Sequence, residues 1–211
     1  MSASRVHLIR HGEVFNPKGV LYGRLDGFPL SELGEQMATD AALALQGTGS
    51  AVTRLVASPL LRTQQSAKPV AQAFDLTVEL DDRLIEPFNI FEGRKMTPGH
   101  VLVRPHLFFH LRNPYRPSWG EPYEQVLSRM TALIEEQAEA TPSGDLVLVT
   151  HQLPIWTTHL ALVGLPLAHN PNRRRCALSS ITTIEKRGAK WVEVDYRDPA
   201  APRRAKDKGA V

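Results

Sequence analysis

The sequence has one cysteine, Cys176, and no apolar run long enough to cross a lipid bilayer. A single cysteine excludes a disulfide bond within the chain, and the apolar stretch near the N-terminus is too short for a secretory signal peptide. We therefore expect a protein of the reducing cytoplasm that has no membrane partner.

The excess of positive over negative residues is also small: the formal net charge is +3 and the sequence pI is about 9.2. Part of this excess lies in residues 199–211, which we expect to be a basic, disordered tail. No motif of basic and aromatic residues indicates nucleic-acid binding, so nucleic acid is not an expected partner. Residues 1–198 are expected to form one domain, since that length is sufficient to bury a core.

Short apolar, β-branched runs predict buried parallel strands over residues 6–9, 55–57 and 146–150. Near the C-terminus, the alternating patterns of residues 180–185 and 190–196 predict a hairpin that turns at Arg187-Gly188. The three apolar runs each end in a polar or charged cluster, so reactive side chains follow directly after the expected strands.

Helical patterns lie between these strands. Ser31 is a candidate N-cap of one helix, and Ser58-Pro59 is interpreted as an N-cap followed by proline at the first helical position of the next. Two further helices are expected over residues 120–140 and 154–163. The alternation predicts an α/β fold, a three-layer α/β/α sandwich with a mostly parallel central sheet, whose ligands gather beyond the C-terminal ends of the strands.

Three segments bring two histidines and two arginines to that edge of the expected sheet. They are Arg10-His11-Gly12, the segment from Ser58 to Arg62, and Thr150-His151. An arginine fork can hold two phosphate oxygens at once. A neutral imidazole, with an unperturbed pKa of about 6.5, is a nucleophile near pH 7, and a second imidazole, when protonated, stabilises charge on the transferred group. Because phosphoryl transfer depends mainly on positioning and charge stabilisation, these residues predict the reaction without a metal or another cofactor.

A proton donor for the leaving oxygen is sought in residues 82–93, where Pro87 and Phe88 provide an apolar setting. Such a setting raises the pKa of a carboxyl group, as an acid that works at neutral pH requires. Both Glu86 and Glu92 meet this description on the residues alone.

With these motifs in this order, the sequence resembles the histidine phosphatase superfamily, the two-histidine group that includes cofactor-dependent phosphoglycerate mutase. The resemblance spans residues 5–185. It implies a phosphoglycerate mutase-like fold and a metal-independent enzyme that acts on a small phosphorylated metabolite. It further implies that His11 becomes phosphorylated, that Arg10 and Arg62 hold the phosphoryl group with His151, and that Glu86 is the proton donor.

The sequence departs from the family pattern at several positions. Gln152 replaces the usual glycine after the second histidine, and Asn16 lies one position early for the family's phosphate-contacting asparagine. Arg24 lies in a loop that the family uses near the substrate. We carry Asn16, Arg24 and Gln152 forward as predicted substrate-binding residues.

Two other segments have two interpretations each. Residues 94–120 are rich in basic and aromatic side chains, and form either a cap over the site or aromatic packing under a basic solvated face. The run Arg173-Arg174-Arg175 is either a solvated turn or a second anion site.

The predicted activity is hydrolysis of a small phosphomonoester through a phosphohistidine. The alternatives are a phosphoglycerate mutase-type phosphotransferase and a non-catalytic module that binds phosphorylated ligands. The compact chain favours the phosphatase, since a mutase must keep its phosphohistidine away from water. The sequence leaves the oligomeric state open, a homo-oligomer included.

Overall fold

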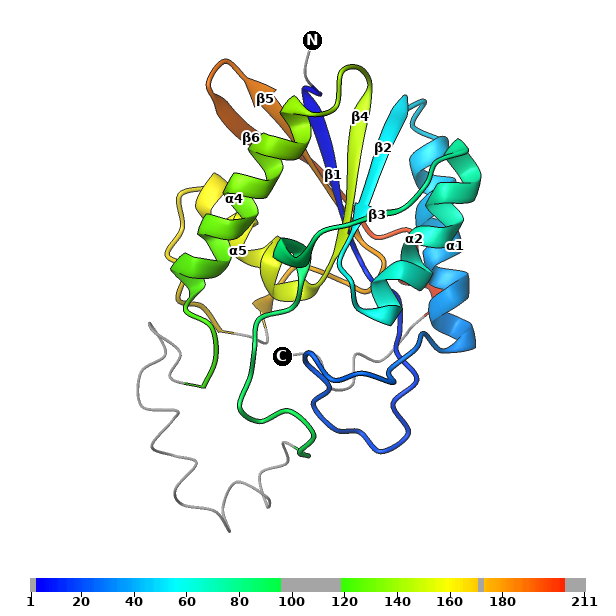
Figure 1. The fold of residues 1–211 in the computed structure, drawn as a ribbon, viewed down its shortest axis with the longest axis vertical. Coiled ribbons are helices and arrows are strands. Elements are labelled where there is room, and N and C mark those ends of the chain that lie inside the picture. Colours follow the sequence, from blue (N-terminus) through cyan, green and yellow to red (C-terminus); the bar gives the residue numbers. More distant parts are fainter. Residues whose placement is uncertain (1–2, 96–118, 171–172, 204–211) are drawn as a thin grey trace.

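The computed structural model of the protein describes residues 3–95, 119–170 and 173–203 (Figure 1). These residues form a six-stranded sheet in the order β3-β2-β4-β1-β5-β6. The strands are β1 (Arg5–Arg10), β2 (Val52–Ala57), β3 (Glu79–Leu80), β4 (Asp145–Thr150), β5 (Ile181–Arg187) and β6 (Lys190–Arg197). The longer helices are α1 (Glu32–Gln46), α2 (Leu61–Phe74), α4 (Tyr123–Glu139) and α5 (Gln152–Leu162), with single 3-10 turns at η1 (Asp82–Leu84) and η4 (Ala201–Arg203).

The sheet is mostly parallel, which confirms the predicted fold class. Strands β3, β2, β4 and β1 pair in parallel, whereas β5 and β6 form the predicted antiparallel hairpin beside β1. All three predicted buried strands are present, and each begins earlier than its apolar run because polar or charged residues stand before that run in the strand, namely Arg5, Thr53 with Arg54, and Asp145. Parallel pairing aligns the C-terminal ends of β1, β2 and β4 at one edge of the sheet.

Two separate cores lie on the two faces of the sheet, as a three-layer sandwich requires. Successive strand side chains point to opposite faces, so Leu8 of β1 packs with the core under α4 and α5, while Ile9 packs with the core under α1 and α2. The same alternation places Leu148 of β4 on the first face and Val149 on the second. Figure 1 shows the two helix pairs on opposite sides of the strands.

The starts of three helices differ from the sequence predictions, and one of these is α5, which begins at Gln152, two residues before the predicted start at residue 154. Ser31 caps α1 as predicted, since its Oγ accepts a hydrogen bond from the backbone N–H of Gly34 at 3.0 Å. The predicted N-cap at Ser58-Pro59 is wrong, because α2 begins at Leu61 with Leu60 as its N-cap. The backbone N–H of Ser58 still donates to Val149 of the neighbouring strand, so this residue continues β2 beyond its end. Helix α4 likewise begins three residues later than residue 120, after Pro122.

The start of the predicted tail is ordered. Ala200 is buried with Met37 and Leu178, and Arg203 forms an ion pair with Asp40 of α1. These contacts hold residues 199–203 against the domain, so the prediction of a disordered tail from residue 199 differs from the structure there. Residues 204–211 lie outside the described residues, as do residues 96–118, which hold most of the predicted cap segment.

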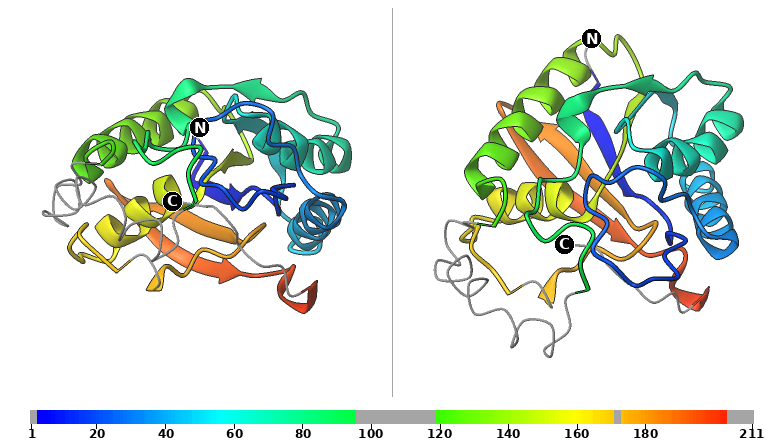
Figure 2. Two further views of the ribbon diagram at one scale, coloured as in Figure 1. Left: turned by 90° about the horizontal axis from the view of Figure 1, so that it is seen from below. Right: turned by 60° about the horizontal axis from the view of Figure 1, so that its bottom comes forward.

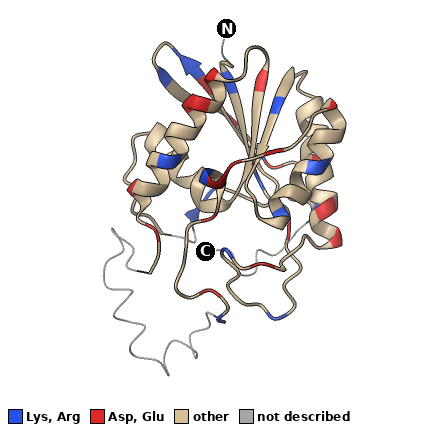
Figure 3. Ribbon diagram, in the orientation of Figure 1, with Lys and Arg blue, Asp and Glu red and all other residues tan. Residues whose placement is uncertain are grey.

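The loops that follow β1 and η1 lie together below the C-terminal edge of the sheet (Figure 2). Backbone hydrogen bonds join them, from Leu21 N–H to the Arg94 carbonyl and from Gly93 N–H to the Leu21 carbonyl. Acidic and basic residues are interspersed over the helical layers (Figure 3). No helix among the described residues is both long and apolar enough to span a membrane.

The central strand β4 supplies a test of this core. Leu148 has 0% of its surface exposed, so Leu148→Ala removes buried methyl groups and leaves a cavity. We expect a loss of about 3 kcal/mol in the free energy of unfolding, measured by urea denaturation. Leu43 on the outer face of α1 is 59% exposed, and Leu43→Ala should change that free energy by less than about 0.5 kcal/mol. Equal losses in the two variants would contradict this description of the core.

Candidate active site

His11 lies directly after β1, and its ring is held in one tautomer. Its Nδ1 is 2.8 Å from the carbonyl oxygen of Gly12, which can only accept, so Nδ1 carries the proton and Nε2 keeps a free lone pair. Burial, together with the positive charges of Arg62 and Arg10, holds the pKa of His11 well below its ordinary value of 6.5. The ring is therefore neutral at pH 7, the state in which Nε2 is a nucleophile.

The position of His11 depends on two glycines. A Cβ added at Gly12 would overlap the carbonyl oxygen of Gly34, and one added at Gly34 would overlap the carbonyl oxygen of Glu13. The backbone N–H of Gly12 also donates to Ser66 Oγ of α2 at 3.0 Å. The chain after β1 is thus clamped between α1 and α2, which fixes the carbonyl that orients His11.

Arg10 and Arg62 are buried beside the ring, each with 1% of its surface exposed. The Nη1 of Arg10 donates to the carbonyl oxygen of Cys176 at 2.6 Å, and Nη2 of Arg62 donates to that of Gly23 at 2.6 Å. Arg62 also lies 4.8 Å from the ring centre of Tyr22. Bonds to neutral carbonyl groups orient the guanidiniums without cancelling their charge. The Nε of Arg62 has no hydrogen-bond partner among the described residues, as expected of a group that awaits an anion.

His151 follows β4 and faces His11 with a distance of 5.2 Å between ring centres. Its Nδ1 lies 3.3 Å from Nη2 of Arg62, which can only donate, so the proton of the neutral ring is on Nε2 and donates to Ser58 Oγ at 2.8 Å. Burial and the charge of Arg62 hold the pKa of His151 well below 6.5. The second imidazole, predicted to be protonated, is thus neutral in this structure, because it is buried next to a guanidinium.

Glu86 supplies a buried carboxyl group at the same place. Its Oε2 is 3.9 Å from Nδ1 of His151 and has no hydrogen-bond partner within the described part of the chain. Burial raises the pKa of Glu86 above its ordinary value of 4.5, although the charges of Arg62, Arg174 and Arg10 oppose the shift. A carboxyl group of raised pKa is suited to hold a proton for a leaving group.

The two candidate acids have different surroundings. Glu86 lines the cavity, whereas Oε1 of Glu92 accepts hydrogen bonds from the backbone N–H groups of Arg24 at 3.0 Å and Asn89 at 3.2 Å. Glu92 therefore stabilises the loop, and the geometry favours Glu86 as the acid. The segment of Glu86 is held in turn by Thr150, whose hydroxyl donates to the Leu84 carbonyl at 2.5 Å.

These side chains converge on one small cavity. Its lining residues are Arg10, His11, Tyr22, Gly23, Arg62, Glu86 and Gln152. The cavity thus brings together a neutral imidazole nucleophile, two guanidiniums and a carboxyl group of raised pKa, with His151 beside them. The described residues contain no group of three or more His, Cys, Asp or Glu side chains that could hold a metal ion.

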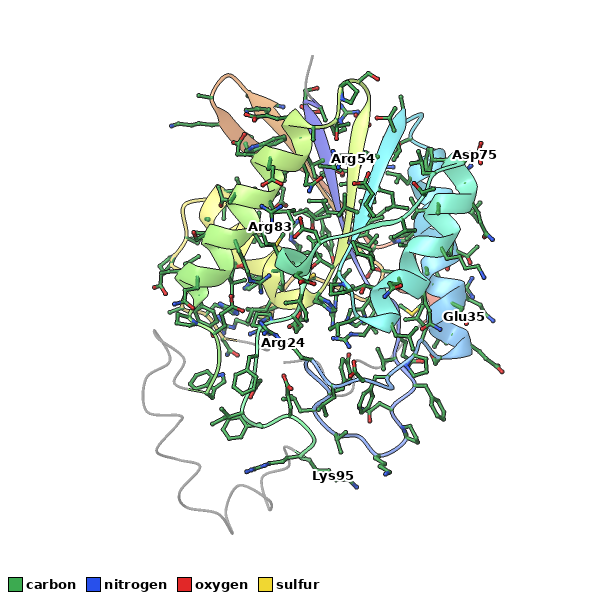
Figure 4. All side chains as sticks on the ribbon, viewed as in Figure 1. Arg24, Glu35, Arg54, Asp75, Arg83 and Lys95 are labelled. Atoms are coloured by element: carbon green, nitrogen blue, oxygen red, sulfur yellow. The ribbon has the colours of Figure 1, made fainter. Side chains whose placement is uncertain are left out.

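The three predicted substrate-binding residues are placed differently. Gln152 lines the cavity. The side chain of Asn16 bonds to the backbone of Val20 in both directions and does not line the cavity. Arg24, labelled below the strand ends in Figure 4, donates to the Glu86 carbonyl at 2.6 Å and pairs with Glu121 at 3.1 Å. It therefore anchors the acid-bearing segment instead of lining the cavity.

Three residues around the site were not among the site residues predicted from the sequence. Ser58 holds His151, and the signal for it was its position at the end of β2, at the same edge as the histidines. Tyr22 lines the cavity, but nothing in the sequence distinguished it from other loop residues. Arg174, one of the three consecutive arginines, is partly buried and bonds to Gln152, although its run is typical of a solvated turn.

The α/β/α fold, with two histidines and two arginines beyond its parallel strands, defines a class of enzymes that handle phosphoryl groups at this edge of the sheet. The family model of the histidine phosphatase superfamily (branch 1) matches residues 6–199, and the chain belongs to this family.

Three similar proteins illustrate the breadth of the family. The uncharacterized protein Rv0525 of Mycobacterium tuberculosis is 46% identical over 94% of this chain and 98% of its own length. The probable phosphoglycerate mutase GpmB of Yersinia pestis is 30% identical over 89% of this chain and 87% of its own. The solved structure of mycobacterial glucosyl-3-phosphoglycerate phosphatase Rv2419c, in complex with VO3, is 26% identical, has a TM-score of 0.73, and covers 91% of this chain and 98% of its own.

The raised pKa of Glu86 has a consequence for stability. The pKa of Glu86 in the folded protein lies above the ordinary value of 4.5. At a pH above that folded-state pKa the carboxyl is ionised in both states, and burial of the charge destabilises the folded state alone. Glu86→Gln should therefore raise the melting temperature at pH 8, by roughly 2–4 °C for each kcal/mol gained. The gain should vanish as the pH falls below 4.5, where the wild-type carboxyl is protonated in both states.

The matched control is Glu139→Gln, since Glu139 is an exposed carboxylate at the end of α4. It should leave the melting temperature within about 1 °C at both pH values. A destabilised Glu86→Gln protein at pH 8 would show that the carboxylate is stabilised where it lies.

Proposed function

We propose that the protein is a phosphatase that hydrolyses a small phosphomonoester through a phosphohistidine on His11. The observation that carries this proposal is the tautomer of His11, because the Gly12 carbonyl holds its proton on Nδ1 and leaves Nε2 as a nucleophile. Arg10, Arg62 and Glu86 line the same cavity and supply the charge and the proton that the reaction needs.

In the first half-reaction, Nε2 of His11 attacks phosphorus in line with the bond to the leaving oxygen. The P–N bond forms as the P–O bond breaks, and the carboxyl of Glu86 gives its proton to the departing alcohol. In the second half-reaction water attacks the phosphorus of phospho-His11. Glu86, now a carboxylate, accepts a proton from that water, and the P–N bond breaks to release phosphate.

The positive charge of the cavity takes the part that a metal ion has in many phosphoryl-transfer enzymes, so we propose a metal-independent reaction. The guanidiniums of Arg10 and Arg62 offer planar donors to the phosphoryl oxygens. A bound dianion favours the charged form of a nearby imidazole, so its arrival should raise the pKa of His151 and draw a proton to that ring. We also propose a cytoplasmic location, in keeping with the single buried thiol of Cys176.

A mutase is the second candidate, supported by the 30% identity to the probable phosphoglycerate mutase GpmB. A phosphatase named for glucosyl-3-phosphoglycerate has the similar fold described above, so the family resemblance accommodates both reactions. A panel of phosphomonoesters, assayed with and without bisphosphoglycerate, separates them. Release of free phosphate without that compound supports the phosphatase, isomer formation supports the mutase, and tight binding without either reaction indicates a non-catalytic module.

Replacement of the nucleophile is the most direct test. His11→Ala should abolish turnover and also the acid-labile ³²P label that a phosphorylated substrate leaves on the protein, because His11 is the one imidazole among the described residues that line this cavity. His159→Gln is the matched control, since His159 pairs with Glu193 and does not line the cavity. It should retain both turnover and label. Persistence of either in His11→Ala would overturn the proposal.

The choice of acid is tested by the leaving group. Glu86→Gln should slow the first half-reaction, the labelling of His11, by about 10²–10⁴ with an alkyl phosphate such as glycerol phosphate, because an alkoxide needs a proton to leave. The loss in that step should be much smaller with p-nitrophenyl phosphate, whose phenolate leaves unassisted, while the hydrolysis of phospho-His11 slows equally for both substrates.

Glu92→Gln is the control for this experiment, because a glutamine oxygen can keep accepting the backbone hydrogen bonds of Arg24 and Asn89. Its activity should be unchanged on both substrates. A selective loss on the alkyl phosphate in Glu92→Gln, with Glu86→Gln unaffected, would show that Glu92, and not Glu86, is the proton donor.

A further inference from the structure

Arg174 forms a chain of hydrogen bonds that ends at the candidate active site. Its Nη1 donates to Oε1 of Gln152 at 3.0 Å, and its Nε donates to Nε2 of His169 at 2.8 Å. His169 in turn places its Nδ1 2.6 Å from the carbonyl oxygen of Leu167. A guanidinium can only donate and a carbonyl can only accept, so every bond in this chain has a single possible direction.

The direction of the chain sets the orientation of the Gln152 amide. Because Arg174 donates to Gln152, the atom that faces Arg174 is the amide oxygen, and the amide N–H₂ group must point elsewhere. Gln152 lines two cavities, the small one with His11 and Arg62 and a larger one of about 340 Å³ that Arg174 also lines. With its oxygen bonded to Arg174, the amide nitrogen is the side-chain atom that Gln152 has left to donate toward the small cavity that it lines.

The far end of the chain is rigidly anchored. Burial lowers the pKa of His169, so the ring stays neutral and its Nε2 remains an acceptor for Arg174. The ring lies against two aromatic side chains, 5.3 Å from Tyr123 and 6.0 Å from Trp156 between ring centres. A guanidinium fixed at Nε by a packed ring has little freedom to turn away from Gln152.

We propose that Arg174 is a positioning residue that locks the Gln152 amide with its N–H₂ group toward the transferred phosphoryl group. Gln152 then gives the phosphoryl oxygens a donor that a glycine, the usual family residue at this position, does not have. Arg174 acts through Gln152 and does not itself line the small cavity. This proposal rests on the proposed function in one respect, the identification of the bound anion as a phosphoryl group.

The test measures binding of inorganic phosphate by calorimetry and inhibition of p-nitrophenyl phosphate hydrolysis by orthovanadate. Gln152→Ala should weaken both by about tenfold, the effect of one hydrogen bond to a charged group. Arg174→Gln should weaken them in the same direction, by about threefold to tenfold. The double variant should bind no more weakly than Gln152→Ala alone, because Arg174 has nothing left to orient.

Arg173→Gln is the matched control, because Arg173 is an exposed arginine of the same run. It should bind phosphate as the wild type does, which excludes a general effect of positive charge. Arg174→Lys keeps the charge but cannot bond to His169 and Gln152 with fork geometry, so it should also weaken binding. This second variant keeps the test decisive where Arg174→Gln fails to fold.

The outcomes separate the proposal from the proposed function. Wild-type protein that binds phosphate without hydrolysing any ester would count against the phosphatase, while the binding series would still judge Arg174. Normal turnover, with Arg174→Gln and Arg174→Lys binding phosphate as the wild type does, would overturn the positioning role alone. Additive losses in the double variant would also overturn it, since they would mean that the two residues act independently.

Discussion

The hydrogen bond from Nδ1 of His11 to the Gly12 carbonyl is the interaction on which the remaining chemistry depends. It decides which nitrogen of the ring carries a lone pair, and only that nitrogen can attack a phosphoryl group. The bond exists because Gly12 and Gly34 allow two backbone segments to approach more closely than any side chain would permit. A structural constraint between α1 and the end of β1 thereby determines which nitrogen of the His11 ring carries the proton.

The site also concentrates buried charge, which is costly in a folded protein. Arg10 and Arg62 lie side by side with two imidazoles and no metal-type ligand cluster among the described residues. The fold tolerates this because burial and the neighbouring guanidiniums hold the pKa values of both imidazoles well below 6.5, and burial raises the pKa of Glu86. A phosphate dianion bound there would lie beside two buried guanidiniums, where the low polarity of the surroundings strengthens electrostatic attraction.

The sequence was informative where function depends on position along a strand. His11 and His151 follow apolar runs, and parallel pairing brings such residues to one edge, so their convergence could be predicted. Contacts between loops that are distant in sequence could not be predicted. Serine commonly caps helices, yet the hydroxyl of Ser58 accepts a hydrogen bond from His151, which is remote in sequence. Asn16 and Arg24 were assigned to the substrate from the family resemblance, which does not show that each side chain is bonded to a backbone carbonyl.

The anchors of the charged groups have one feature in common. Arg10, Arg62 and Arg24 all donate to main-chain carbonyl oxygens, at Cys176, Gly23 and Glu86. A main-chain acceptor survives most substitutions of the residue that carries it, provided the path of the chain is kept. Loops around the cavity can therefore change in sequence while the positions of these three guanidiniums are kept.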